Sequence, residues 1–321
     1  MGVFKLRSKI NLNSLEEGAI LQESDFSTVT PEGNFLQFEY LQEDNKVRQP
    51  TIVKPGIFSV VKTMAGFVLE PTSFTNDAIL EEFVNTKEIE NIVDCFFNNL
   101  HVYKEEGIET PKRGVLLYGP AGSGKTTAIS KSIRKYSNMS GTFVLVWHTS
   151  KYEADDIKDF IKSFQYDGVE RMILVCEDLG GLENEMTRMR SDSSLLALLD
   201  NQERTFTIPT MIVATTNYAE NFAENLTNRP GRFDDKLKVG YLDGEARKAL
   251  LKFFTKGRAT ESELTLIASK ECEKFLPAHI REVNLRSRLR SETIEKTIKK
   301  VIEEIKLYNK AFDDKSRSIG L

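Results

Sequence analysis

The chain has 321 residues, of which 40% are hydrophobic and 29% are charged, and its formal net charge at pH 7 is −4. This apolar fraction is enough for a folded core, so the class of wholly disordered proteins is excluded. A chain-wide basic surface for nucleic acid is also excluded, although a local basic groove remains open. The first residues lack the apolar run of a signal peptide, and no stretch approaches about 18 consecutive apolar residues, so no membrane contact is expected.

The amino-acid composition changes twice within the first third of the chain. Residues 1–34 are polar and poor in aromatic side chains, which predicts a flexible lead-in. Residues 35–75 contain short apolar runs between turn residues, which predicts a small β-rich module with strands near 35–41, 57–61 and 66–69. Apolar residues at helical spacing over 76–107 predict helices.

Beyond residue 110, apolar strands alternate with helices. The predicted strands are 114–118, 143–147, 172–176, 210–214 and 238–241, and the predicted helices between them are 126–136, 154–164 and 194–201. Strands of this kind are typical of a parallel sheet covered on both faces, so we expect an α/β domain over 76–242. From 243 to 321 the strand pattern stops, and four helices are predicted over 245–255, 262–274, 277–289 and 291–308.

Cysteine and histidine are sparse and scattered. Cys95, Cys176 and Cys272 are far apart and form no CxxC pair. This pattern predicts reduced thiols in a cytoplasmic protein, and neither a zinc site nor a cysteine hydrolase is expected.

One segment matches the phosphate-loop pattern G-x-x-x-x-G-K-[ST] between a strand and a helix. Its residues are Gly119, Pro120, Ala121, Gly122, Ser123, Gly124, Lys125 and Thr126, followed by Thr127. Glycines allow backbone N–H groups to turn inward around phosphate oxygens, and the helix that follows adds the positive end of its dipole. We expect Lys125 to reach the β- and γ-phosphates of a nucleotide and the Thr126 hydroxyl to hold Mg²⁺.

The third strand of the alternating region ends in two acids, Glu177 and Asp178. Ligands bind at the carboxyl ends of strands in open α/β sheets, and a magnesium-dependent nucleotide hydrolase requires acids there. By position, Glu177 is expected to hold the metal and Asp178 to polarise the attacking water. The usual order is Asp then Glu, so the assignment of the two roles stays open. A solvated strand end is the alternative.

Two further polar features follow. The fourth strand ends at Asn217, which could orient the attacking water if this strand neighbours the third. Arg229 and Arg232 flank Pro230-Gly231, a spacing that a helix face does not produce. A guanidinium suits a γ-phosphate because its planar fork of donors stays charged. A surface loop with ordinary ion pairs explains the two arginines equally well.

In chain order, these segments resemble an AAA+ ATPase of the classic AAA type over about residues 111–251. Residues 112–120 resemble the segment that leads into the family's phosphate loop, 214–217 its sensor-1 strand and 228–234 its second region of homology. The order of the two acids, Glu177 and then Asp178, is similar to the order in the ATPase core of the mitochondrial translocase of the Rieske iron–sulfur protein. The β-rich stretch is weakly similar to soluble bacterial AAA ATPases.

The resemblance implies a P-loop NTPase core with a five-stranded parallel sheet of order 5-1-4-3-2 and a C-terminal helical lid. It also implies a ring, expected to be a hexamer, with ATP and Mg²⁺ at each subunit interface. Arg229 and Arg232 would act on the neighbour's γ-phosphate, Asn217 would be sensor 1, and Ala278 would lie near the adenine. Arg281 is the nearest candidate for a sensor-2 arginine, although classic members usually lack one. Tyr152 is a pore-loop candidate or a packing residue.

Together these features predict ATP hydrolysis that drives the remodelling or unfolding of a protein or protein complex. One alternative is a nucleic-acid motor or loader with a basic face on the last two helices, formed by Arg286, Arg288, Arg290, Lys296, Lys299 and Lys300. Glutamates interleave with these cations, which is typical of a solvated helix surface. The other alternative is a slow, nucleotide-gated assembly scaffold.

Overall fold

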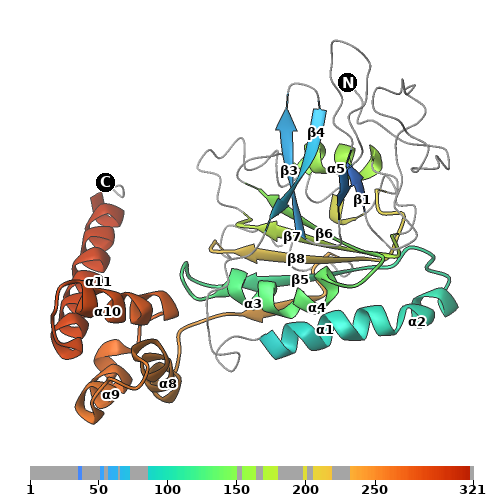
Figure 1. Ribbon diagram of the computed structural model, residues 1–321. Helices are drawn as coiled ribbons and strands as arrows, with labels where there is room; N and C mark the ends of the chain where they lie inside the picture. Colours follow the sequence, from blue (N-terminus) through green and yellow to red (C-terminus); the bar gives the residue numbers. More distant parts are fainter. Residues whose placement is uncertain are drawn as a thin grey trace. The chain divides into compact units, whose positions relative to one another are not determined.

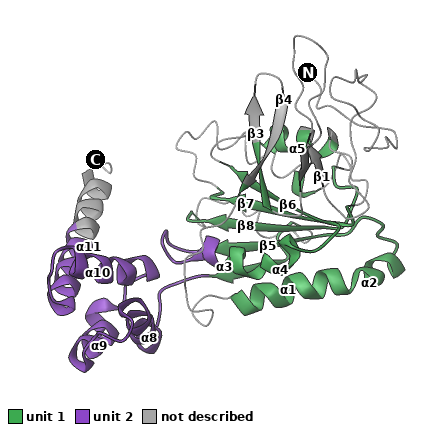
Figure 2. Cartoon of the chain, in the orientation of Figure 1, with its two compact units in different colours: residues 1–75, 86–118, 128–238 green, residues 76–85, 119–127, 239–321 purple. Residues whose placement is uncertain are grey.

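The computed structural model describes only part of the chain (Figure 1). The described residues are 35–37, 51–53, 57–63, 66–72, 86–149, 154–163, 169–179, 198–200, 205–218 and 232–318. The chain divides into two compact units (Figure 2). Unit 1 comprises residues 1–75, 86–118 and 128–238, and unit 2 comprises 76–85, 119–127 and 239–321. The phosphate loop therefore belongs to the unit that holds the C-terminal helices.

Unit 1 is built on a seven-stranded sheet of order β4-β3-β6-β7-β8-β5-β9. Its strands are β3 (Ile57–Thr63), β4 (Gly66–Thr72), β5 (Lys112–Tyr118), β6 (Thr142–His148), β7 (Arg171–Glu177), β8 (Thr210–Thr216) and β9 (Asp235–Lys238). Within this described sheet β3 and β4 pair antiparallel, and all other pairs are parallel. The strands β5 to β9, numbered along the chain, have the order 5-1-4-3-2. The predicted core topology is confirmed.

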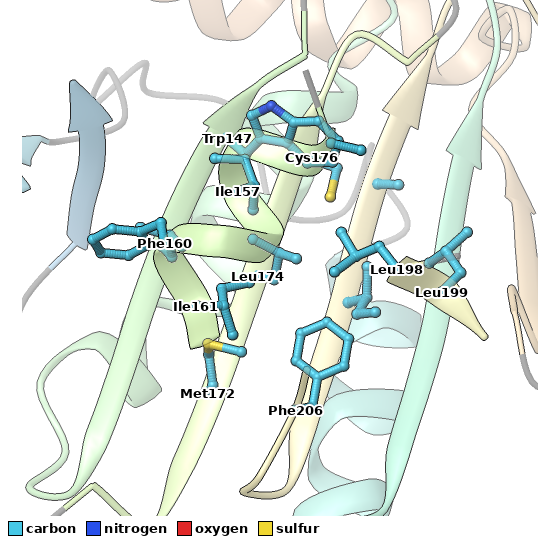
Figure 3. Packing of buried hydrophobic residues seen from close by; sticks show 14 of the residues in the cluster. Trp147, Ile157, Phe160, Ile161, Met172, Leu174, Cys176, Leu198, Leu199 and Phe206 are labelled. Carbon is cyan, nitrogen blue, oxygen red and sulfur yellow. The ribbon is translucent and has the colours of Figure 1, made fainter. Parts of the chain in front are cut away.

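The central strands β6, β7 and β8 are buried along almost their whole length because helices cover both faces of the sheet. Alternate residues such as Leu145 and Leu174 join a buried cluster with Ile157 and Phe160 of α5 (Ala154–Ser163), as Figure 3 shows for part of this cluster. The intervening residues, such as Val144 and Ile173, are fully buried as well. Figure 1 labels the other helices of this unit: α1 (Thr86–Asn98), α2 (Leu100–Glu105) and α4 (Arg134–Ser137), together with α3 (Lys125–Ser132), which begins in the phosphate loop.

Three elements of unit 1 differ from the sequence prediction in position, continuity or pairing. The fifth core strand is Asp235–Lys238 rather than 238–241, because an edge strand with one buried residue, Leu237, has almost no apolar pattern to read. The predicted helix 126–136 is interrupted at Ile133, between α3 and α4. The β3–β4 hairpin, expected in a separate module, extends the sheet through pairing of Ile57–Ser59 with Val144–Val146. The remaining short strands, β1 (Phe35–Gln37) and β2 (Thr51–Val53), pair with each other.

The C-terminal part of unit 2 is helical, as predicted. Its helices are α8 (Gly244–Thr255), α9 (Glu261–Ala268), α10 (Pro277–Leu289) and α11 (Ile294–Ser318), with a short 3₁₀ turn at Lys270–Cys272. The first three begin where the sequence offers a cap or a proline: the Asp243 carboxylate accepts from Ala246 N–H, Thr260 and Glu263 form a capping box, and Pro277 opens α10. None of the helices in the described ranges has the length and apolar content needed to span a bilayer. The predicted lead-in, residues 1–34, lies outside those ranges.

Candidate nucleotide-binding site

The phosphate loop takes a backbone path that favours glycine at three of its positions. Gly119 has φ +152°, Gly122 has φ +81° and Gly124 has φ +98°. A Cβ at Gly119 would lie 2.1 Å from the carbonyl oxygen of Val239, and a Cβ at Gly122 would lie 3.0 Å from the Cβ of Ala278. Both the left-handed conformation and the close approach of neighbouring atoms therefore require glycine.

Lys125, the first residue of α3, folds back over this loop. Its ammonium donates to the carbonyl oxygens of Gly119, at 2.8 Å, and Pro120, at 3.0 Å. The Ser123 hydroxyl is buried and has no hydrogen-bond partner in the described part of the chain. A buried hydroxyl and an ammonium in one glycine-rich loop fit a phosphate group, whose oxygens accept from both. The exposed Thr126 follows Lys125 on the first turn of α3.

The loop also contacts the start of α10 within unit 2. The Ala278 N–H donates to the carbonyl oxygen of Gly122, at 3.4 Å. Ala278 is the residue that the sequence prediction placed near the adenine. Its position against the loop is compatible with that role, which stays a prediction.

Polar side chains gather at the carboxyl ends of β6, β7 and β8 in unit 1. Asn217 Nδ2 donates to Asp178 Oδ1 at 2.7 Å, and the Asp178 N–H donates to Thr215 Oγ1 at 3.0 Å. Asp178 has φ +59°, so these bonds hold it in a conformation that is uncommon outside glycine. The role expected for Asn217 required its strand, β8, to lie beside the strand that ends in the acids, β7. These two strands are neighbours in the sheet.

The other acid of the pair has a partner that the sequence prediction missed. Glu177 Oε2 lies 2.9 Å from Nδ1 of His148, the last residue of β6. Burial and the nearby Asp178 carboxylate raise the pKa of Glu177, and the His148 contact opposes this rise. His148 could have been found by extending to β6 the strand-end rule that located Asp178 and Asn217.

The arginine pair is described only in part. Arg229 lies outside the described residues. Arg232 is 4% exposed, and its Nε and Nη2 each donate at 2.7 Å to a carboxylate oxygen of Asp200 in the same unit. The family resemblance predicted that Arg232 faces a neighbouring molecule. In the structure its side chain is bonded within its own unit instead.

One known protein family matches the middle of the chain. Residues 115–241 match the family "ATPase family associated with various cellular activities (AAA)". Over these residues the chain is similar to AAA ATPases. The matched range contains the phosphate loop, both acids, Asn217 and both arginines, and the lid helices α8 to α11 follow it.

Proteins similar to this chain come from archaea, bacteria and a eukaryote. The chain is 29% identical to a proteasome-activating nucleotidase of Saccharolobus solfataricus over 245 residues, which cover 70% of this chain and 58% of the relative. It is 25% identical to a proteasome-associated ATPase of Mycolicibacterium vanbaalenii over 320 residues, covering 86% and 47%. It is 27% identical to the ATPase family gene 2 protein of Schizosaccharomyces pombe over 239 residues, covering 70% and 29%. The chain thus spans at most 58% of these three relatives.

Four of the six cations proposed as a nucleic-acid face, namely Arg286, Lys296, Lys299 and Lys300, form ion pairs with nearby glutamates. Arg286 Nε donates to Glu282 and its Nη1 to Glu304, each at 2.7 Å. Lys299 contacts Glu295, and Lys300 contacts Glu292. These intramolecular pairs disfavour the nucleic-acid motor, because a phosphate backbone would have to displace the carboxylates.

Proposed function

We propose that this chain binds ATP with Mg²⁺ and hydrolyses it. The observation that carries the proposal is the 2.7 Å contact between Asn217 and Asp178 at the carboxyl ends of β8 and β7. An amide that touches an acid at this edge of the sheet suits the positioning of a water molecule for attack on a phosphate. The strand β5, from which the chain continues into the phosphate loop, pairs with β8.

Each predicted residue then has a defined task. The loop, residues 119–127, holds the phosphates through its N–H groups and Lys125. Thr126 and Glu177 hold Mg²⁺, which neutralises negative charge on the phosphates. Asp178 accepts a proton from the attacking water, Asn217 orients that water, and Ala278 contacts the adenine. Among the described residues no three potential ligands form a metal cage, which suits Mg²⁺ held mainly by phosphates and water.

We further propose that the chain works as a ring in the cytoplasm, with a hexamer as the expected form. Arg229 of one subunit would then act at the nucleotide of the next, in the arrangement that the family resemblance implies. Two of the relatives are named for the proteasome, a protein-degrading partner. By analogy, the substrate class is a folded protein or protein complex that the ring unfolds or remodels.

Hydrolysis is tested by comparing the purified chain with its Lys125→Ala and Asp178→Asn variants. The chain should release phosphate from ATP only with Mg²⁺, Lys125→Ala should lose ATP binding, and Asp178→Asn should bind ATP but turn it over very slowly. Equal phosphate release by all three proteins would disprove the assignment. Sedimentation with ATP then reports the ring.

The class of substrate is tested with polymers. An unfolded protein such as casein should raise the hydrolysis rate, whereas single-stranded DNA and RNA should not. Stimulation by nucleic acid alone would favour the motor, and stimulation by neither would favour the slow scaffold.

A further inference from the structure

An ion pair within unit 1 involves Arg232, one of the two arginines that the family resemblance implies for catalysis at a neighbouring subunit. Arg232 donates through Nε and Nη2 to the two carboxylate oxygens of Asp200, each at 2.7 Å. The Arg232 side chain is 4% exposed and that of Asp200 is 23% exposed. This bidentate geometry commits one edge of the guanidinium to Asp200 and fixes its direction.

Buried neighbours hold both members of the pair in place. Leu199, which precedes Asp200, and Phe233, which follows Arg232, belong to the same hydrophobic cluster and are 0% and 2% exposed. Neither backbone can move outward without withdrawing an apolar side chain from the core. Leu199 and Phe233 therefore hold in place the backbone next to each member of the ion pair.

The backbone around Arg232 is also bonded to β5. The Asp234 N–H donates to the carbonyl oxygen of Gly114 at 2.8 Å, and the Gly114 N–H donates to Asp234 Oδ2 at 3.0 Å. A Cβ at Gly114 would lie 1.9 Å from the carbonyl oxygen of Arg232. Residues 232–234 thus pass directly over β5 before they continue into β9.

The charges agree with a role for Asp200 as the local counter-ion. Its hydrogen bonds are the main cause that raises the pKa of Arg232. Burial lowers the pKa of Lys112 on β5, and the carboxylates of Asp234 and Asp200 oppose that shift. Loss of Asp200 would leave the buried Arg232 and the half-buried Lys112 as like charges with less compensation.

We propose that Arg232 acts within its own subunit as a positioning residue. Clamped to Asp200, it fixes residues 232–234, which lead into β9. Arg229 lies three positions before Arg232 in the sequence. Arg229 alone then acts on the neighbour's nucleotide, and Asp200 becomes as necessary for hydrolysis as Arg232. The inference rests on the proposed ring, because only in a ring does the position of Arg229 matter to another subunit.

The experiment compares Asp200→Asn, Arg232→Gln and the double variant in the full chain. We expect each single variant to bind ATP nearly normally and to lower kcat by about 10²-fold or more, a part of the roughly 10³–10⁵-fold effect of an arginine finger. The double variant should be no slower than the slower single variant, because both changes remove one interaction. Near-normal kcat in Asp200→Asn with slow Arg232→Gln would instead mean that Arg232 itself reaches the nucleotide.

A mixing experiment separates positioning from general damage to the fold. Asp200→Asn keeps an intact nucleotide pocket, and Lys125→Ala keeps an intact clamp. The mixture should hydrolyse ATP faster than the sum of the separate proteins, since some interfaces combine the intact halves. A variant that is merely unstable gives no such rescue, and that result would overturn the proposal.

Two controls complete the test. Arg229→Ala mixed with Lys125→Ala is the reference for the ring: no rescue there removes the proposed ring, whereas rescue there but not with Asp200→Asn removes only the clamp. If Asp200→Asn shows no cooperative melting, Asp200→Glu replaces it, because it keeps the charge and displaces the carboxylate by one methylene. We then expect roughly 10-fold lower kcat with rescue by mixing, and unchanged kcat contradicts the clamp.

Discussion

His148 and Glu177 meet across the carboxyl ends of two neighbouring strands, with Nδ1 of the imidazole 2.9 Å from Oε2 of the carboxylate. Glu177 is the proposed metal-side acid, so His148 is placed to orient a metal ligand. Such outer partners are typically worth about 10–100-fold in metal affinity or activity.

His148→Ala should therefore lower kcat by about 10–100-fold and raise the Mg²⁺ concentration needed for half-maximal hydrolysis. His148→Asn is the matched control, because its amide nitrogen can take the place of Nδ1 and should restore part of the rate. A magnesium titration of steady-state hydrolysis measures both effects. An unchanged magnesium requirement in His148→Ala would contradict the orienting role.

The reversed order of the acids leads to a second prediction. Asp178→Asn should keep ATP bound and slow hydrolysis by about 10²–10⁴-fold, because the attacking water loses its proton acceptor. Glu177→Gln should instead weaken the magnesium dependence of ATP binding. Binding of a fluorescent ATP analogue, with and without Mg²⁺, distinguishes them, and the opposite pattern would exchange the two roles.

Lys125→Ala should abolish ATP binding at micromolar nucleotide. The Lys125 ammonium lies over the loop, bonded to the Gly119 and Pro120 carbonyls, from where it can turn to phosphate oxygens. Its loss removes charge-assisted hydrogen bonds to the β- and γ-phosphates. Lys131→Ala, on the same helix but outside the loop, is the control and should bind normally in a calorimetric titration.

The residues of this site that could be predicted from the sequence belong to a short motif or follow directly after a predicted strand. The phosphate loop and the strand-end residues Asp178 and Asn217 were predictable, because a fixed motif and parallel-strand geometry bring such residues to one edge. The Arg232–Asp200 pair was not, since 32 residues separate its members and no spacing rule links them. The edge strand β9 was displaced in the prediction because Leu237 is its single buried residue.

The lid contains a buried cation that should govern its stability. Arg247 is 4% exposed and donates to the carbonyl oxygens of Leu242, Ile267, Ala268 and Ser269. These include the last carbonyls of α9, which have no partner within the helix. Arg247→Met should destabilise the lid by about 2–4 kcal/mol, because it leaves several buried carbonyls unpaired.

Thermal melting and limited proteolysis of the lid measure this loss. Lys248→Ala, one residue further along α8, is the control and should change stability by less than about 0.5 kcal/mol. A melting curve for Arg247→Met that matches the parent protein would refute the structural role.

The start of α10 predicts a pH dependence. The Leu276 N–H donates to His279 Nδ1 at 3.0 Å, and burial lowers the pKa of His279. The neutral imidazole is thus favoured in the folded state, while the unfolded chain protonates near about pH 6.5. The stabilisation is fully present above that pH and is lost as pH falls from about 6.5 through the lowered folded pKa.

The parent lid should therefore lose more melting temperature between about pH 7.5 and 5.5 than His279→Gln does. Glutamine at this position keeps a side-chain acceptor for the N-cap N–H but does not titrate. Equal pH dependence in the two proteins would assign the effect to another group.

Gly114 and the carbonyl of Arg232 leave no room for any side chain between them. The backbone of β5 and the backbone at Arg232 are in direct contact, so no flexible side chain between them can adjust to a displacement. A displacement of residues 232–234 would therefore displace β5 as well, because the two stretches of unit 1 are in direct main-chain contact.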